Sequence, residues 1–334
     1  MCMKLSVIIP YYNTDALVGR ALDSLLDQDL AASDYEIIVV DDGSSEEPVV
    51  LKDYARRYPQ VNYYRLNHTG LSPARNFGMS LAKGDWLYFC DSDDYVQRQV
   101  LGRIIAVAEE RGLEMINAAC LMLKPSDPVP APKRNFSNVS ETRTGMEYLG
   151  NPPSPMTCGL WVSLFRRSFI EALGLRFENV FYVEDCLFKL QVFKHASKVA
   201  FIDVELYFYI YNEKSIMHSG KRRNCAAFAA AKIRGIEAKM ALVDDPATPE
   251  QTALFLKDRC VDDVIGLFIN VFRYSTVQET MACYSRLEAL GAYPVGKTKS
   301  KSGRIMRALI NRKHLWIFMC RIYHILPLKL RQRL

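Results

Sequence analysis

The 334-residue sequence is long enough for one large α/β domain with an appendage, or for two domains. Its hydrophobic content of 49% and charged content of 24% are typical of a globular protein, which excludes a disordered or fibrous chain. The formal net charge of +6 is unevenly spread, because residues 297–334 contain eleven Lys or Arg and no Asp or Glu, whereas the rest carries 32 basic and 37 acidic residues. A mildly acidic body is therefore followed by a basic tail.

The cysteines and the N-terminus point to one compartment. Nine cysteines are scattered with no C-x-x-C spacing for zinc or a redox pair, which is typical of buried thiols under reducing conditions. The apolar run before Pro10 is too short for a signal-peptide core or a membrane span. We therefore expect the body to be cytoplasmic.

The first 120 residues alternate apolar, β-branched runs with helical periodicity, which is the pattern of βα units around a mostly parallel sheet. A helix is expected at 73–82, with Ser72 as its cap and Pro73 at its first position. The expected strands are residues 4–10, 35–42, 61–66, 85–91 and 114–119.

Residues 124–155 differ in composition from the first 120 residues, because seven of the fifteen prolines fall there. Such a stretch is typical of a mobile loop or lid, with a helical turn expected at 145–149. Further along, a strand is expected at 204–212, and two or three amphipathic helices are expected within 221–291.

Three of the expected strands end in polar side chains, which should meet at one edge because ligands of open parallel sheets bind beyond the carboxyl ends of the strands. Asp91 and Asp93 form a D-x-D pair, which suits a hard cation such as Mg²⁺ or Mn²⁺. The alternative is that these acids only make a turn. For Asp94 we favour a helix cap, directly before a helical pattern at 96–110. The polar strand ends are Tyr11, Tyr12 and Asn13; Asp41, Asp42 and Ser44; and Asp91, Asp93 and Asp94.

Five motifs occur in a fixed order: "SVIIPYYN", "IIVVDDGSSE", "NHTGLSPARNFGM", "GDWLYFCDSDD" and "YVEDCLF". This ordered set resembles the family 2 glycosyltransferases of the GT-A fold, over residues 4–217. The resemblance implies an α/β fold of the Rossmann-like nucleotide-diphospho-sugar transferase type, with a mixed, mostly parallel sheet flanked by helices and a helical C-terminal extension. The expected parts are a GT-A domain at 1–220 with a donor half (1–120) and an acceptor half (121–220), a helical region at 221–296, and a basic amphipathic tail at 297–334.

The resemblance also implies a nucleotide-sugar donor, with uridine diphosphate as the expected nucleotide. Asp42 would accept a hydrogen bond from the base, while Tyr12 or Tyr11 would lie against its ring; the alternative for both tyrosines is a half-buried strand end. Arg75 would face the diphosphate, or would be a surface arginine paired with an acid. The donor-binding residues are then Pro10, Tyr12, Asn13, Asp42, Arg75, Asn76 and Asp91, and the ligands of Mn²⁺ or Mg²⁺ are Asp93 and Asp91.

An acceptor hydroxyl needs a base as it attacks the anomeric carbon. The resemblance gives that role to Asp185 and acceptor contacts to Glu184 and Trp161; the alternatives are plain helix-start acids and a core aromatic. Ser163 stands where the family often has Lys, so the acceptor contacts depart from the family pattern. His218 would reach the diphosphate or be a solvated surface residue.

The basic tail mixes Lys and Arg with large apolar residues, and its longest apolar run, at 315–320, is too short to span a bilayer. A cationic amphipathic stretch of this kind suits the interface of an anionic membrane, whereas the alternative is a helix packed on the body. No nucleic-acid module accompanies the charge, so nucleic acid is not an expected partner.

The resemblance, together with the basic tail, thus implies an inverting, metal-dependent glycosyltransferase that acts on a glycan or lipid-linked acceptor in surface-polysaccharide synthesis, at the inner face of the cytoplasmic membrane. One alternative is a nucleotide-sugar-binding, membrane-peripheral regulator or scaffold without catalysis. Another is a nucleotidyltransferase, which also uses paired acids and a metal but releases pyrophosphate.

Overall fold

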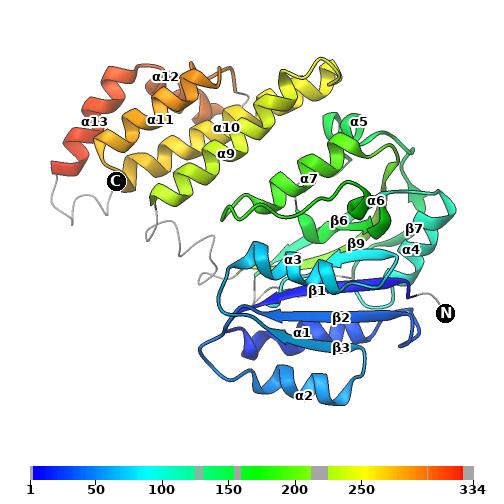
Figure 1. The fold of residues 1–334 in the computed structure, drawn as a ribbon. Coiled ribbons are helices and arrows are strands. Elements are labelled where there is room, and N and C mark those ends of the chain that lie inside the picture. Colours follow the sequence, from blue (N-terminus) through cyan, green and yellow to red (C-terminus); the bar gives the residue numbers. More distant parts are fainter. Residues whose placement is uncertain are drawn as a thin grey trace. The chain divides into compact units, whose positions relative to one another are not determined.

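The computed structural model describes residues 3–124, 127, 131–153, 159–211, 225–298 and 300–325. The chain forms two compact units (Figure 1). The first, called the sheet unit, comprises residues 1–180 and 184–212, and the second, called the helical unit, comprises residues 181–183 and 213–334.

The sheet unit is built on one nine-stranded sheet, whose main path runs β3-β2-β1-β4-β8-β6-β9-β5, with β7 paired to β9. The first four strands of this path are parallel, whereas β8 runs antiparallel to both of its neighbours. β1 and β2 are buried over their whole length, as expected for strands covered on both faces. The strands are β1 (Leu5–Tyr11), β2 (Tyr35–Asp41), β3 (Val61–Arg65), β4 (Trp86–Phe89), β5 (Tyr95–Val96), β6 (Met115–Leu123), β7 (Arg134–Val139), β8 (Ser163–Arg166) and β9 (Val199–Ile210).

Helices cover both faces of the sheet. On one face, alternate β1 residues such as Val7 join the core that includes Leu22 of α1 and Ile104 of α4. On the other face, Ile8 meets α3 at Gly78, where an added Cβ would lie 2.6 Å from the Ile8 side chain. The glycine therefore lets α3 approach the sheet closely. The helices of this unit are α1 (Asp15–Leu26), α2 (Val49–Arg57), α3 (Leu71–Leu81), α4 (Leu101–Glu110), α5 (Gly145–Gly150), the 3₁₀ turn η1 (Leu160–Val162), α6 (Arg167–Ala172) and α7 (Glu184–His195).

The strand predictions for β1 to β4 and for β6 are confirmed, with small shifts at their ends. The strand expected at 204–212 is longer at its start and forms β9. The loop expected at 124–155 is wrong in part, because this stretch contains β7 and α5, and α5 confirms the expected turn at 145–149. β7 escaped the pattern because its six residues, RNFSNV, are mostly polar and largely exposed.

Two expected helix caps are wrong. α3 begins at Leu71 after Gly70, whose φ of 106° suits glycine, so Ser72 lies inside the helix and is buried. The helix expected at 96–110 begins at Leu101, and Asp94 does not cap it. The Asp94 carboxylate instead accepts hydrogen bonds from the Tyr207 hydroxyl (2.8 Å) and the Ile210 N–H (2.8 Å).

The helical unit contains α9 (Cys225–Val243), α10 (Glu250–Tyr274), α11 (Val277–Ala289), α12 (Lys301–Ile310) and α13 (Lys313–Ile325), coloured from yellow-green to red in Figure 1. The first three confirm the helices expected within 221–291. A separate core holds the unit together, with Phe268 of α10 against Tyr284 of α11 and Trp316 of α13. Among the described helices, none has the length and hydropathy needed to cross a membrane.

Candidate active site

Three of the polar strand ends lie at one edge of the sheet, because β1 sits between β2 and β4 and all three strands are parallel. Hydrogen bonds join these ends to one another. The Asn13 N–H donates to Ser44 Oγ (2.9 Å) across β1 and β2, and the hydroxyls of Thr14 and Ser92 lie 2.8 Å apart across β1 and β4. The edge is thus a connected polar surface.

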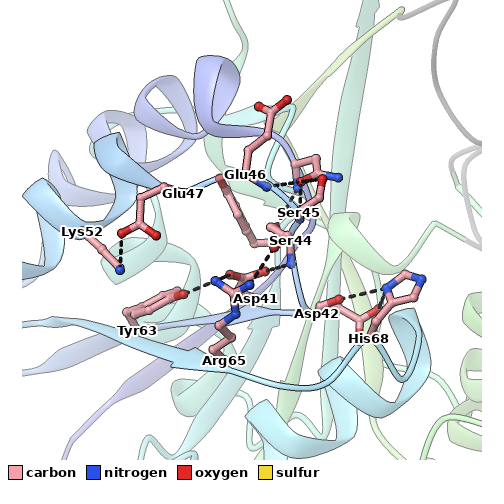
Figure 2. A network of polar contacts seen from close by, with 12 residues as sticks. Asp41, Asp42, Ser44, Ser45, Glu46, Glu47, Lys52, Tyr63, Arg65 and His68 are labelled. Carbon is pink, nitrogen blue, oxygen red and sulfur yellow. Dashed lines mark hydrogen bonds and ion pairs between the residues drawn. The ribbon is translucent and has the colours of Figure 1, made fainter.

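Asp41 is a buried structural residue rather than a ligand-facing one (Figure 2). Its carboxylate accepts the Ser44 N–H (2.8 Å) and the Tyr63 hydroxyl (2.9 Å). Arg65 adds a hydrogen bond to the Ser44 carbonyl (2.7 Å). Together these contacts fix the loop that follows β2.

Asp42, the next residue, holds the segment that leads into α3. Its carboxylate accepts the N–H groups of Thr69 (2.6 Å) and Gly70 (2.9 Å). His68 Nδ1 lies 3.2 Å from the same carboxylate (Figure 2). Gly43 is required beside it, because its φ is +75° and an added Cβ would lie 2.6 Å from the His68 backbone nitrogen. This contact explains the glycine of the D-D-G-S motif.

Tyr12 and His68 form an exposed aromatic pair above this segment. Their rings stack with centroids 4.7 Å apart, and Tyr12 is 44% exposed. Tyr11, by contrast, is buried in the core, so it offers no ring face to a ligand. Sequence reasoning missed His68, although it lies inside the quoted "NHTG" motif, because a lone histidine beside an exposed tyrosine gives no periodic signal.

Pro10 and Asn13 shape the end of β1. Pro10 is buried within the strand, in register with Val40 of β2. Asn13 has a φ of +51°, and its side-chain oxygen accepts the N–H of Ser45 (3.0 Å). Asn13 therefore braces the loop after β2.

Arg75 is the centre of the site. It is 2% exposed, and its guanidinium touches three carboxylates. Nη2 lies 3.2 Å from Asp91, and Nη1 lies 2.5 Å from Asp185 and 3.3 Å from Glu184. Arg75 is therefore not a surface arginine, although the pairing with acids that this alternative expected is present, and Asp91 of the D-x-D motif forms one cluster with both acids of the E-D pair.

Both acids at the start of α7 have raised pKa values. Burial raises the pKa of Asp185 to about 7, against the lowering effect of Arg75, and neighbouring Glu184 and Asp91 raise it further. Lys189, one turn along α7, lowers it. The pKa of Glu184 is likewise raised by burial, and its Oε2 atom is buried without a hydrogen-bond partner among the described residues. Asp185, 26% exposed, is thus a carboxylate whose proton affinity suits a general base near neutral pH.

The acids after β4 have unequal roles. Burial, together with repulsion from Asp91 and Asp93, raises the pKa of Asp94 to about 8. Tyr207 joins the turn, since its hydroxyl accepts the Asp91 N–H (3.2 Å) and donates to Asp94. Asp94 is therefore a structural acid, which leaves Asp91 and Asp93 as the partly exposed pair.

The pair fits a hard divalent cation. Three carboxylates crowd one turn strongly enough to repel one another, and such negative potential is what a cation neutralises. No group of three His, Cys, Asp or Glu in the described ranges forms a ligand set by itself. Two carboxylates are enough for Mg²⁺ when phosphates and waters complete its shell.

The remaining predicted residues brace the site from within. The Asn76 side chain exchanges two hydrogen bonds with the Phe177 backbone (2.9 and 2.8 Å), which fixes the segment before α7. Trp161 is largely buried and stacks on Tyr207 with ring centroids 4.7 Å apart. That placement favours the core role over a sugar-stacking one. His218 lies outside the described residues.

Lys189 was not anticipated from the sequence. Its ammonium is fully buried and donates to Ser163 Oγ (2.7 Å), the Gly159 carbonyl (3.0 Å) and Asn117 Oδ1 (3.3 Å). It therefore ties α7 to the start of β8 and to the turn that carries Trp161. Lysine is rarely fully buried unless it is paired, so the sequence alone gives no sign that this one is.

A model of the family "Glycosyl transferase family 2" matches residues 6–174, half of the chain. The chain belongs to this family. Among curated relatives, the uncharacterized glycosyltransferase EpsJ of Bacillus subtilis is 32% identical over 220 residues, which cover 65% of this chain and 63% of EpsJ. The poly(ribitol-phosphate) beta-N-acetylglucosaminyltransferase TarS of Staphylococcus aureus is 24% identical over 62% of this chain and 35% of its own. The match to EpsJ thus spans less than two thirds of that relative.

Solved structures support the fold. The structure of S. aureus TarS residues 1–349 in complex with UDP-GlcNAc matches with a TM-score of 0.60 at 17% identity, covering 93% of this chain and 92% of that one. A mannosyltransferase from Pyrobaculum calidifontis in complex with GDP-Man and Mn²⁺ matches with a TM-score of 0.52 at 14% identity, covering 97% and 88%. The expected GT-A architecture with C-terminal helices is confirmed.

Proposed function

We propose that this family member transfers a sugar from a nucleotide-diphosphate sugar, with UDP as the expected nucleotide, to a hydroxyl group of a glycan or lipid-linked acceptor in surface-polysaccharide synthesis. The observation that carries the proposal is the buried Arg75, which holds Asp91 at one end of its guanidinium and Asp185 at the other. The names of TarS and of its complex with UDP-GlcNAc support a hexosyl or N-acetylhexosaminyl group.

The step follows from the chemistry of Asp185. The acceptor oxygen forms a bond to the anomeric carbon while the bond from that carbon to the diphosphate breaks, and the nucleoside diphosphate leaves. The acceptor proton passes to the Asp185 carboxylate, which Arg75 orients through the 2.5 Å contact. A single base acting opposite the leaving group gives inversion.

The donor would lie along the strand ends. The exposed Tyr12 and His68 rings beside Asp42 offer the base a stacking surface. Asp91 and Asp93 would hold Mn²⁺ or Mg²⁺, which when bound would supply a Lewis acid for the departing diphosphate. Three carboxylates already surround the Arg75 guanidinium. Its contact with the diphosphate therefore stays a prediction.

A contact of residues 297–334 with an anionic membrane, at the inner face of the cytoplasmic membrane, would bring the enzyme to a lipid-linked acceptor. The eleven basic residues of this tail and its lack of acids support that placement.

The test is a panel of UDP- and GDP-sugars incubated with the purified protein, with and without Mn²⁺, in which nucleotide release and thermal shift are measured. We expect one donor to stabilise the protein and to be hydrolysed slowly. Asp185→Asn should abolish turnover but keep donor binding, whereas Asp93→Ala should lose the metal-dependent part of the thermal shift.

Asp53→Asn is the matched control, because Asp53 is an exposed acid that pairs with Arg56 and Arg57 on α2. It should behave as the wild type. Turnover retained in Asp185→Asn would overturn the assignment of the base, and release of pyrophosphate from nucleoside triphosphates would show a nucleotidyltransferase. Donor binding without turnover in the wild type, with any acceptor, would favour a regulator.

A further inference from the structure

α13 has two apolar faces. Trp316, Cys320 and Tyr323 on one face are buried in the core of the helical unit. On the other face four large apolar side chains are spaced by three, four and three residues, which places them in one stripe along the helix. These are Leu315, Phe318, Ile322 and Ile325, exposed by 39%, 59%, 45% and 82%.

Exposed large apolar residues are concentrated in α13 rather than scattered over the chain. The described residues include sixteen exposed large hydrophobics, and four of them fall within the thirteen residues of α13. Ile305 on α12, the neighbouring helix in sequence, adds another at 61%. Single exposed apolar residues need no explanation, whereas a contiguous apolar strip indicates a partner.

Exposed basic side chains lie on α12, on α13 and between these two helices. Lys301, Arg304, Arg312 and Arg321 are exposed, and no acid within the described ranges forms an ion pair with any of them. Arg321 follows Phe318 by three positions and precedes Ile325 by four, so it flanks the stripe. Since residues 297–334 contain no acid, two copies of this face would repel each other, whereas an anionic surface complements it.

We propose that the stripe of α13, together with the exposed basic residues of α12 and α13, docks on the surface of an anionic lipid bilayer. At a rise of about 1.5 Å per residue the helix is roughly 20 Å long. It would lie in the interface, with its stripe among the acyl chains and its basic residues at the headgroups. The benefit of this docking rests on the proposed function, since docking would bring the enzyme to a lipid-linked acceptor. Vesicle binding tests the docking separately from sugar transfer.

The test is co-sedimentation of the full chain with phosphatidylcholine vesicles and with vesicles that also contain phosphatidylglycerol. We expect binding to the anionic vesicles only, weakened by added salt. The double variant Phe318→Ser/Ile322→Ser should lower the partition by about tenfold or more. Arg304→Gln/Arg321→Gln should lower it roughly fivefold for each removed charge.

The matched control is Leu254→Ser, which removes an exposed leucine from α10 (58% exposed) and should bind like the wild type. Circular dichroism and thermal unfolding establish that the variants fold. Wild-type protein that stays in the supernatant, or an equal loss in Leu254→Ser, would overturn the proposal. So would a lipid-free dimer in light scattering that becomes monomeric in Phe318→Ser/Ile322→Ser, because the stripe would then bind a second copy.

Discussion

The cluster around Arg75 and the outer face of α13 depart from the usual rule of burial in opposite directions. In the sheet unit a guanidinium and its acids are buried, whereas in the helical unit a stripe of large apolar side chains is exposed. Both arrangements cost folding free energy unless something offsets them. The cost of burying Arg75 is offset within the chain, because its guanidinium pairs with three carboxylates. No described part of the chain covers the exposed stripe of α13. The difference separates a preorganised site from a docking surface.

The largest expected effect comes from removing the buried cation. Arg75→Met leaves Glu184, Asp185 and Asp91 without their shared partner, and we expect a loss of about 3–5 kcal/mol in the free energy of unfolding. Urea denaturation measures this loss. Arg75→Lys is the control, since it keeps the charge but cannot hold two acids with one planar group, and it should lose less. A loss under about 1 kcal/mol in Arg75→Met would mean that the ion pairs behave as surface pairs.

A smaller effect is expected at the loop after β2. Gly43→Ala puts a Cβ against the His68 backbone at a φ of +75°, which should cost roughly 1–3 kcal/mol and weaken the thermal shift caused by nucleotide. Gly174→Ala is the matched control, because Gly174 has a φ of +61° but no atom within 4 Å of the added Cβ. Equal losses in the two variants would show that only backbone conformation matters and that the contact with His68 does not.

The third prediction concerns pH. In the proposed reaction Asp185 takes the acceptor proton as the carboxylate, and since its pKa is raised to about 7, kcat/KM should fall about tenfold for each pH unit below that value. The groups that face Asp185 are Arg75, Asp91, Glu184 and Lys189. Rate measurements across this range with the identified donor provide the profile. A rate that is flat from pH 5 to 8 would exclude a base of raised pKa.

Lys189 should affect the pH at which kcat/KM begins to fall on acidification. Lys189→Met removes a positive charge that lowers the pKa of Asp185, so the fall in kcat/KM on acidification should begin at a higher pH. Ser163→Ala removes a hydrogen-bond partner of the Lys189 ammonium but keeps its charge. The pH at which kcat/KM falls should therefore be unchanged in this variant. Equal shifts in both variants would attribute the effect to packing alone.

The smallest effect is expected on α13. Phe318→Ala should change the free energy of unfolding by no more than about 0.5 kcal/mol, because its side chain is exposed. Phe268→Ala, in the core of the same unit, should cost about 3–5 kcal/mol. Thermal and urea unfolding compare the two. A large loss in Phe318→Ala would place that ring in the core and remove the contrast with the Arg75 cluster.

The sequence predicted those parts of the fold that local pattern controls. β1 to β4 were found because apolar, β-branched runs between turn residues leave a clear signal, and three helices of the helical unit followed from their periodicity. β7 was missed because it is polar, and β8 because four residues carry too little pattern. The cap at Ser72 failed because Gly70, with its positive φ, ends the preceding segment first.

The motifs predicted which residues gather at the candidate site, but not the contacts that these residues make. The chemical types of Asp91 and Asp185 were legible in the sequence, and their positions at a strand end and a helix start hold. The burial of Arg75 and of Lys189 was not legible, because each depends on partners that lie far along the chain. Asp94 illustrates the limit, since its partners Tyr207 and Ile210 are more than a hundred positions away.

The ion pair between Arg75 and Asp185 also bears on how the chain folds as it is made. The two residues are 110 positions apart, and a chain emerges from the ribosome N-terminal end first. When β1 to β4 have been synthesised, Arg75 has Asp91 within its cluster but neither acid of α7. The nascent first half must keep this guanidinium hydrated until α7 appears. The cluster around Arg75 therefore closes late in biogenesis, when α7 joins the sheet unit.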